Sequence, residues 1–281
     1  MNSTRIAISI PTLCLVNGHP GSELSVRDRG LAYGDGLFET IRVSQGRATL
    51  LAQHLQRLAR GATVLRMTLD LSIVRSELEA AAAQLVDGLL KLIVTRGESG
   101  RGYAIPAHTT PTRIISFSPL PDYPTAHARL GVHLYPCVTR LGYQPLLAGI
   151  KHLNRLEQVL ARSEWQDVSY AEGLVCDLQG RPVEGTMSNI ILRLHGRWVT
   201  PALDQCGVRG VMRDYLMEQF AAAGDVVIER EVSFNELLAS EEVFCCNSVF
   251  GVWPVVRLGE YSWPIGPHTR RAHTLAEQVL I

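Results

Sequence analysis

Residues 147–160 read LAGIKHLNRLEQVL, and this run decides how the rest of the chain is interpreted. A small and apolar approach ends at Lys151, and the spacing beyond it predicts a helix over residues 154–165. An apolar setting disfavours a charged ammonium group, so it lowers the pKa of a lysine amine. A lowered pKa is what a lysine needs in order to form a covalent bond with a carbonyl carbon. The run therefore marks Lys151 as a candidate reactive amine.

Lysine is scarce in this sequence. Of its 27 lysines and arginines, only Lys91 and Lys151 are lysines. The guanidinium group of arginine stays protonated and is not nucleophilic, so these two residues are the candidates for amine chemistry. Lys91 lies in the middle of an apolar stretch, where an edge or partly exposed strand position is a better interpretation than a catalytic role.

The composition excludes several classes of protein. The chain has 281 residues, 46% of them hydrophobic and 19% charged, which is typical of a globular protein. Its 27 basic and 27 acidic residues balance, so there is no electrostatic argument for nucleic-acid binding. The nine histidines show no metal-ligand spacing, and we expect no metal site. No stretch of about 18 apolar residues predicts a membrane-spanning helix.

The N-terminal stretch and the cysteines bear on the compartment. Residues 6–16 could pass for a weak signal peptide, but Pro11 interrupts them and the turn Asn17-Gly18 follows. We interpret them as a leading segment and a first strand. The six cysteines are dispersed without C-x-x-C spacing, which predicts a reduced, cytoplasmic protein.

The pattern of elements predicts two α+β lobes. Three prolines, Pro119, Pro121 and Pro124, mark a linker over residues 119–126. The expected domains are a smaller N-terminal domain (1–118) and a larger C-terminal domain (127–281). Strands are expected at 13–16, 23–26, 37–43, 48–50, 89–95 and 112–118, and then at 130–139, 171–177, 188–194, 197–200, 225–228, 242–246 and 251–256. Helices are expected at 51–67, 71–85, 154–165, 211–223 and at the C-terminal end.

Several positions could bind an anion or a ring nitrogen. Residues 207–210 read GVRG directly before a helix, and free backbone amides at a helix N-terminus bind phosphate. An ordinary glycine turn is an equally good interpretation. Asn247 and Ser248 follow an apolar strand, while Arg57 lies on a helix where its spacing alone favours a solvated charge. Glu184, beside a glycine, could bind a ring N–H or lie in an exposed turn.

Together these residues resemble the fold-type IV pyridoxal-phosphate enzymes, over nearly the whole chain from about Leu13. The family includes D-amino acid and branched-chain aminotransferases and carbon–oxygen lyases. The resemblance implies a two-lobed architecture like that of the D-amino acid aminotransferases. Besides the opening run, it rests on Asp28-Arg29, residues 33–36 and 38–40, His54-x-x-Arg57-Leu58, Arg96-Gly97 and residues 100–103.

The resemblance also implies roles for individual residues. Lys151 would bind pyridoxal 5'-phosphate covalently and then act as general base and acid, with the hydroxyl of Thr40 beside it. Glu184 would keep the pyridine nitrogen protonated. The remaining cofactor-binding residues would be Arg57, Ser188, Val208, Arg209, Asn247 and Ser248, with the phosphate held by Arg57, Ser248 and the amides of Val208 and Arg209. Arg101 and Tyr103 would bind the substrate.

The match is better to the lyase branch than to the aminotransferases. Branched-chain aminotransferases commonly have glycine at the position of Thr40, and tyrosine at the position of Leu156. The lyase reading implies the substrate 4-amino-4-deoxychorismate, split into 4-aminobenzoate and pyruvate, and a homodimer. A D-amino acid or branched-chain aminotransferase is the alternative, since residues 151–154 do not exclude it. A silent binding protein would not need to retain both Lys151 and Glu184. Arg209 stands where many relatives have threonine, so only its amide carries over.

Overall fold

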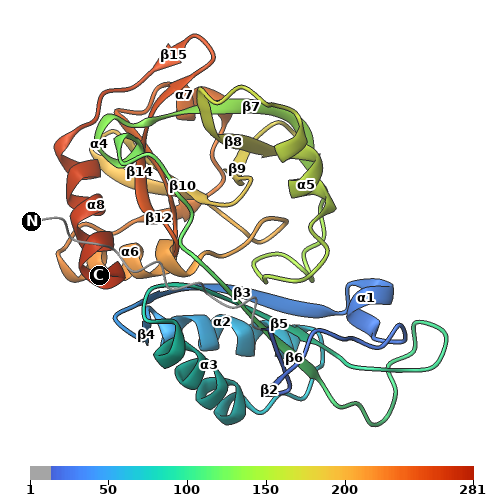
Figure 1. Ribbon diagram of the computed structural model, residues 1–281. Coiled ribbons are helices and arrows are strands. Elements are labelled where there is room, and N and C mark those ends of the chain that lie inside the picture. Colours follow the sequence, from blue (N-terminus) through green and yellow to red (C-terminus); the bar gives the residue numbers. More distant parts are fainter. Residues whose placement is uncertain (1–13) are drawn as a thin grey trace, which may run out of the picture.

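Two β-sheets, one in each half of the chain, organise the molecule (Figure 1). A computed structural model describes residues 14–281. The leading segment and the expected strand start at Leu13 lie outside the described residues. The combination of helices with two sheets confirms the predicted α+β class. Residues 119–125 lie between the last strand of the first sheet and the first helix of the second half, which begins at Ala126. The exact domain boundaries stay a prediction.

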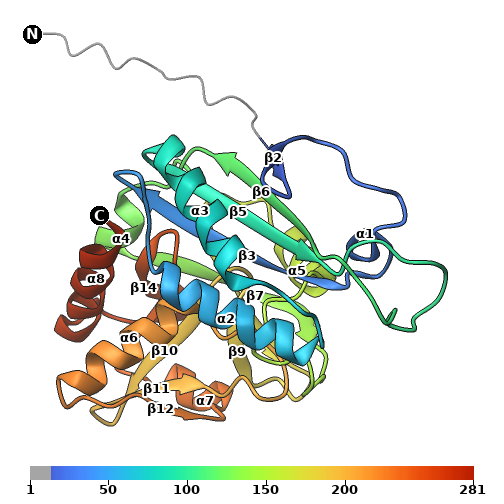
Figure 2. The same cartoon turned by 90° about the horizontal axis from the view of Figure 1, so that it is seen from below.

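The first sheet has six strands in the order β2-β1-β6-β5-β3-β4, all antiparallel. Its strands are β1 (Cys14–Val16), β2 (His19–Pro20), β3 (Gly36–Ser44), β4 (Arg47–Ala48), β5 (Gly88–Thr95) and β6 (Thr112–Ser118). The short helix α1 (Arg29–Tyr33) precedes β3. Helices α2 (Leu51–Val64) and α3 (Leu71–Leu85) cover one face of the sheet (Figure 2).

Alternation along β3 separates the two faces of this sheet. Leu37, Glu39 and Ile41 are buried, whereas Phe38 and Thr40 between them are only partly buried. Side chains alternate between faces in a strand, so the first set points toward α2 and α3 and the second set toward the other lobe. Leu37 and Ile41 join the apolar core of this lobe. The second set is therefore free to line a site between the lobes.

The second sheet has nine strands, and β7, β8, β9, β13 and β14 adjoin along its main path. Its strands are β7 (Val132–Leu141), β8 (Tyr170–Asp177), β9 (Pro182–Gly185), β10 (Asn189–Leu194), β11 (Arg197–Pro201), β12 (Ile228–Arg230), β13 (Glu242–Asn247), β14 (Gly251–Leu258) and β15 (Tyr261–Ser262). Its helices are α4 (Ala126–Leu130), α5 (Leu156–Ser163), α6 (Val211–Ala222), α7 (Phe234–Leu238) and α8 (Pro267–Leu280). No helix among residues 14–281 is long and apolar enough to cross a bilayer.

Some expected elements differ from the structure. Residues 23–26 form no strand; the Asn17-Gly18 turn instead pairs β1 with β2, so that Val16 faces His19. Two other expected elements are displaced: β12 begins at Ile228 rather than at residue 225, and the strand expected at 130–139 is β7, which begins at Val132 because Leu130 still belongs to α4. The short elements α1, β2, α4, β9, α7 and β15 were not predicted. Each has five residues or fewer, too few to establish a hydrophobic period.

The segment around Lys151 joins the two sheets. Its backbone pairs with the first sheet, because Lys151 O accepts a hydrogen bond from Phe38 N at 3.0 Å. It also pairs with the loop before α6, because Gly149 N donates to Gly207 O and Arg209 N donates to Gly149 O, each at 3.0 Å. The lysine backbone is therefore fixed by both lobes at once.

Candidate active site

A cavity of about 540 Å³ is lined by residues of both lobes. This volume is within the usual range for small-molecule and cofactor sites. The structure brings most of the predicted site residues together in its lining: Thr40, Arg57, Lys151, Glu184, Ser188, Val208, Asn247 and Ser248. Residues from distant parts of the sequence thus converge on one space, although the role of each remains a prediction.

The amine of Lys151 is in a desolvated position in this cavity. Its Nζ lies 4.3 Å from the centre of the Phe38 ring, on the cavity-facing side of β3. Desolvation and the nearby Arg57 guanidinium lower the pKa of Lys151 to about 8. A fraction of the amine is therefore unprotonated near neutral pH and able to act as a nucleophile or base. This agrees with the expectation drawn from the apolar run before it.

Arg57 is buried, contrary to the solvated position that its helical spacing favours. Its Nε donates to Glu39 Oε1 at 2.9 Å and its Nη2 donates to Glu39 Oε2 at 2.5 Å. His54 Nδ1 lies 2.7 Å from the same Oε2. Burial raises the pKa of Glu39, but the charge and hydrogen bonds of Arg57 and His54 outweigh it and lower the pKa to about 2. Glu39 and His54 thus fix the guanidinium of Arg57, whose Nη1 reaches Arg209 O at 3.1 Å.

Glu184 projects from β9 and is also buried. Its Oε2 accepts a hydrogen bond from Val208 N at 2.8 Å, and its Oε1 accepts a longer one from Gln158 Nε2 at 3.4 Å. No arginine hydrogen-bonds directly to this carboxylate among the described residues. Burial raises the pKa of Glu184 to about 7. A positively charged group placed beside Glu184 would therefore stabilise its ionised form.

The predicted phosphate contact through two backbone amides is not available as the structure stands. Val208 N donates to Glu184, and Arg209 N donates to Gly149 O, so each amide already has an acceptor. The side chain of Arg209 turns away from the cavity and pairs with Asp214 at 2.8 Å. The loop before α6 lies where it was expected, but these amides must exchange partners before they can bind an anion.

Several polar side chains predicted to bind the cofactor also have partners within the protein. Ser188 Oγ donates to Glu172 Oε2 at 2.6 Å, and Ser248 Oγ donates to Thr40 O at 3.2 Å. The Asn247 side chain caps the turn after β13, where its Oδ1 accepts from the amides of residues 249 and 250. Asn247 therefore has a structural role in the cavity wall, and its contact with the cofactor stays a prediction.

Three predicted residues lie away from the cavity of their own chain. Arg101 and Tyr103 are exposed in the loop between β5 and β6 and do not line the cavity. Arg209, in the loop before α6, is also exposed and does not line the cavity. Lys91 is not at a sheet edge, because β5 has neighbours on both sides, but its side chain is exposed as expected.

Sequence reasoning missed one polar wall of the cavity. Arg155, Gln158 and Arg162 all line it, at spacings of three and four residues along the start and body of α5. Side chains at such spacings share one helix face. That period directly after Lys151 was a usable signal. Phe38, Tyr123 and Thr186 were missed as lining residues because they come from separate elements.

The charge of the lining indicates the kind of ligand that fits. Among residues 14–281, four cationic side chains and one carboxylate line the cavity: Arg57, Lys151, Arg155, Arg162 and Glu184. A ligand with several negative charges, and with a positively charged ring nitrogen for the carboxylate, complements this arrangement. Arg57 and Glu184 lie at separate positions beside the lysine amine, so one aromatic cofactor with a phosphate group fits the residues that are present.

Comparisons with known proteins agree with this geometry. Residues 36–258 match the family model for amino-transferase class IV. An aminodeoxychorismate lyase of Vibrio harveyi is 35% identical over 91% of this chain and 96% of its own length. The crystal structure of 4-amino-4-deoxychorismate lyase from Pseudomonas aeruginosa is 54% identical, covers 96% of this chain and 100% of its own, and superposes with a TM-score of 0.94. A D-alanine aminotransferase of Bacillus licheniformis is 28% identical over 92% of each chain.

Proposed function

Because the chain belongs to the amino-transferase class IV family, we propose that it is a pyridoxal-phosphate-dependent lyase that converts 4-amino-4-deoxychorismate to 4-aminobenzoate and pyruvate. The observation that carries the proposal is the desolvated amine of Lys151, which shares one cavity with Arg57 and Glu184. The 54% identity to a structure named as this lyase supports the choice within the family. The pathway would be the one that supplies 4-aminobenzoate for folate.

The residues present fit the cofactor. Lys151 would hold it covalently, Arg57 would bind its phosphate, and Glu184 would accept a hydrogen bond from the protonated ring nitrogen. That protonated nitrogen would favour the ionised form of Glu184, whose pKa burial raises to about 7. Bound there, the cofactor supplies a ring that stabilises negative charge at the carbon bearing the substrate amine.

Once the substrate amine takes its place on the cofactor, the freed amine of Lys151 would have two proton transfers to perform. Its Nζ takes the proton from the ring carbon that bears the substrate nitrogen, which a pKa near 8 allows close to neutral pH. The carbon–oxygen bond to the enolpyruvyl group breaks, and the proton held on Nζ can pass to the methylene carbon of the leaving group. Atoms balance without a second substrate. The hydroxyl of Thr40 lines the same cavity and would assist this transfer.

The substrate carries two carboxylates, and the cavity offers cations beyond those the cofactor needs. Arg155 and Arg162 line the α5 side of the cavity, where no cofactor role is assigned to them. A carboxylate beside an arginine gains a charge-assisted hydrogen bond. These two residues would therefore hold the substrate carboxylates together with the predicted contact from Arg101.

The predicted substrate contact of Arg101 needs a second copy of the chain. Arg101 is exposed on a loop that does not line its own cavity, and in Figure 1 the segment between β5 and β6 projects past α1. We therefore include the homodimer in the proposal, with Arg101 and Tyr103 directed to the cavity of the partner. The dispersed cysteines, all free in the structure, support a cytoplasmic location.

An aminotransferase is the alternative within the family. Thr40 and Leu156 argue against a branched-chain aminotransferase. Leu156 is 75% exposed and its side chain lies outside the cavity lining. The D-alanine aminotransferase of Bacillus licheniformis is less similar than the lyases. The two activities differ in one requirement: the aminotransferase needs a 2-oxo acid acceptor and the lyase does not.

The test is to give the cofactor-loaded protein 4-amino-4-deoxychorismate without any 2-oxo acid and to measure both products. We expect equal amounts of pyruvate and 4-aminobenzoate. Lys151→Ala should lose at least about 10²-fold in rate, because general acid–base catalysis typically contributes that much or more. Lys91→Ala is the matched control, since it removes the other lysine and should leave the cofactor attached.

Absence of product from a cofactor-loaded protein would exclude the lyase activity. Amino transfer from a D-amino acid or branched-chain amino acid to a 2-oxo acid would then establish the alternative. Borohydride reduction followed by peptide mapping gives a separate answer about the lysine, because the cofactor should become fixed to Lys151 and not to Lys91.

A further inference from the structure

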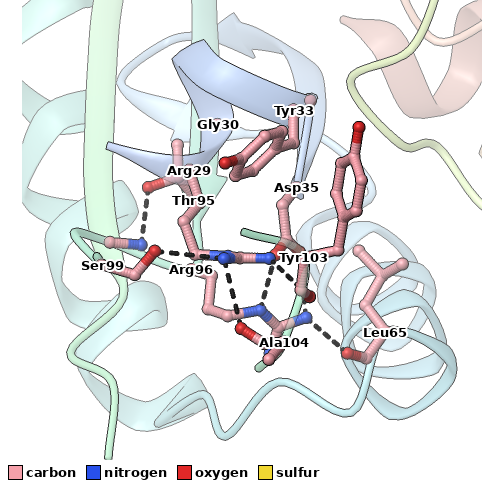
Figure 3. Close-up of polar contacts among 12 residues, drawn as sticks. Arg29, Gly30, Tyr33, Asp35, Leu65, Thr95, Arg96, Ser99, Tyr103 and Ala104 are labelled. Atoms are coloured by element: carbon pink, nitrogen blue, oxygen red, sulfur yellow. Dashed lines mark hydrogen bonds and ion pairs between the residues drawn. The ribbon is translucent and has the colours of Figure 1, made fainter. Parts of the chain in front are cut away.

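A buried arginine outside the cavity anchors the loop that carries Arg101. Arg29, in α1, is 4% exposed and points toward residues 99–104, which we call the 99–104 loop. Its Nη1 donates to Ser99 Oγ and to Gly102 O, each at 3.1 Å, and to Ala104 O at 3.4 Å (Figure 3). Its Nη2 donates to Tyr103 O at 3.3 Å. One guanidinium group thus binds three consecutive carbonyl groups.

The guanidinium of Arg29 is itself held by a carboxylate. Its Nε donates to Asp35 Oδ2 at 2.8 Å. Arg96 donates to the same carboxylate through Nε at 2.7 Å and Nη2 at 2.9 Å. It also donates to the carbonyl oxygens of Leu65 and Arg66, just after the end of α2. The two arginines lower the pKa of Asp35 although burial opposes them. Asp35 therefore stays ionised and fixes Arg29 relative to α2, the helix of Arg57.

The loop has few other attachments. A Cβ atom at Gly100 or Gly102 would meet nothing within 4 Å, and Tyr103 is 84% exposed. The Tyr103 ring lies 5.3 Å from that of Tyr33, whose hydroxyl accepts a hydrogen bond from Gly102 N at 3.3 Å. Since Arg29 contacts backbone atoms, it can fix the path of the loop while leaving the side chain of Arg101 outside the network.

We propose that Arg29, held by Asp35, is a positioning residue that fixes the 99–104 loop so that Arg101 reaches a substrate carboxylate in the site of a second copy. This inference rests on the lyase function and dimer proposed above. Arg29 does not touch the cavity, so it acts on the reaction through Arg101. A misplacement of about 1 Å at a substrate-binding group is enough to cost roughly 10²-fold in rate.

Hydrogen–deuterium exchange of the cofactor-loaded protein tests the anchoring directly. We expect Arg29→Lys to speed amide exchange over residues 99–104, because lysine cannot span the three carbonyl groups and the carboxylate together. Arg27→Gln is the matched control: Arg27 pairs with Glu98 at the base of the same loop but is 74% exposed, and exchange should not change. Ser99→Ala, which removes one contact, is a milder variant should Arg29→Lys fold poorly.

Kinetics then test whether the anchoring acts through Arg101. Arg29→Lys and Arg101→Gln should each raise KM for 4-amino-4-deoxychorismate about tenfold with a smaller change in kcat. In the Arg101→Gln background, Arg29→Lys should add little, because the two residues act as one unit. Unchanged exchange in Arg29→Lys overturns the proposal, and so does a KM effect that multiplies fully in the double variant. If the wild-type protein does not split the substrate, the lyase proposal fails, while the exchange experiment still decides whether Arg29 anchors the loop.

Discussion

Two glutamates on opposite lobes, buried to a similar degree, have pKa values displaced in opposite directions. Glu39 in β3 is 1% exposed with a pKa of about 2, and Glu184 in β9 is 4% exposed with a pKa of about 7. Burial raises the pKa of both. The difference comes from Arg57, which hydrogen-bonds Glu39 through two nitrogens, whereas Glu184 has an amide and a distant carboxamide as donors.

The contrast shows how the two lobes can present different charges to the two ends of a ligand in one cavity. On the first lobe the charge of the Glu39 carboxylate is neutralised by Arg57, and Glu39 in turn fixes the position of the Arg57 side chain. On the second lobe the carboxylate lacks a closely bound cation and is stabilised when a ligand provides one. Four experiments test this division of roles, in order of decreasing expected effect.

Arg57→Ala should produce the largest change. We expect the affinity for pyridoxal 5'-phosphate to fall on the order of 10²-fold, since losing one partner of a buried charge pair costs about 2–5 kcal/mol. The affinity for pyridoxal, which lacks the phosphate, should change far less. Titration of apo-protein followed by absorbance measures both. Arg60→Ala, one turn further along α2 and 44% exposed, is the control. Equal losses for the two ligands would contradict a phosphate role.

Glu39→Gln should destabilise the apo-protein by about 3 kcal/mol near pH 7, the order expected when a pKa is lowered from 4.5 to about 2. The folded-state pKa of Glu39 lies below its unfolded value. Its contribution is therefore complete above pH 4.5 and is lost as pH falls through 2. Urea unfolding at several pH values should show the gap between wild type and variant narrowing below pH 4.5. A gap that does not depend on pH would mean that the ionised pair is not its source.

Glu184→Gln should change the free energy of unfolding of the apo-protein in the opposite direction, toward higher stability. The folded-state pKa of Glu184 is above its unfolded value, so its favourable contribution is present below pH 4.5 and is lost as pH rises through 7. The amide cannot ionise, so we expect the variant to be more stable than wild type at pH 8 by about 1–2 kcal/mol and to lose that advantage toward pH 5. Thermal unfolding without cofactor measures it. A variant less stable than wild type at pH 8 would show that Glu184 is already paired in the apo-protein.

Arg162→Gln should have the smallest effect. Arg162 lines the outer part of the cavity, stacks over the Trp165 ring and is exposed. An exposed charge pair contributes about 0.2–1 kcal/mol, so KM for the substrate should rise no more than about fivefold. Salt screens such a contact, and the difference from wild type should shrink at high ionic strength. Steady-state kinetics at two salt concentrations give the result, and a difference that salt does not change would place Arg162 in a desolvated contact.

Much of the fold could be predicted from the sequence where a hydrophobic period was long. The helix at 71–85 and the strand at 112–118 agree with the structure at both ends. Asp70 explains the first of these, because its carboxylate caps the helix by accepting from the amides of residues 72 and 73. The strand at 23–26 was wrong because a turn, rather than an apolar alternation, selects the partner of β1. Elements of two to five residues carried no usable period.

The residues of the site also differ in how far the sequence alone could predict them. Lys151 could be singled out because its small and apolar neighbours in the sequence already indicated a desolvated amine, whereas Glu184 was assigned only through the family resemblance. The burial of Arg57 could not, because its partner Glu39 lies on another element and the helical position by itself indicates solvent. The motif at residues 207–210 left a phosphate site and an ordinary turn equally open, and the amides of Val208 and Arg209 were assigned through the resemblance, yet tertiary hydrogen bonds decide their partners. That Arg101 lies on an exposed loop outside the cavity, which bears on the proposed dimer, appears only when the cavity and the loop are seen together.

The backbone pairing of the Lys151 segment with both sheets has a consequence for assembly of the protein. Phe38 N on one side and Gly207 O on the other are bonded to residues 151 and 149. A chain whose two lobes are each folded but not docked therefore lacks a correctly placed lysine, and its Arg57 and Glu184 belong to separate halves. Cofactor capture, with its change in absorbance, should accordingly report the docking of the lobes rather than the folding of either one.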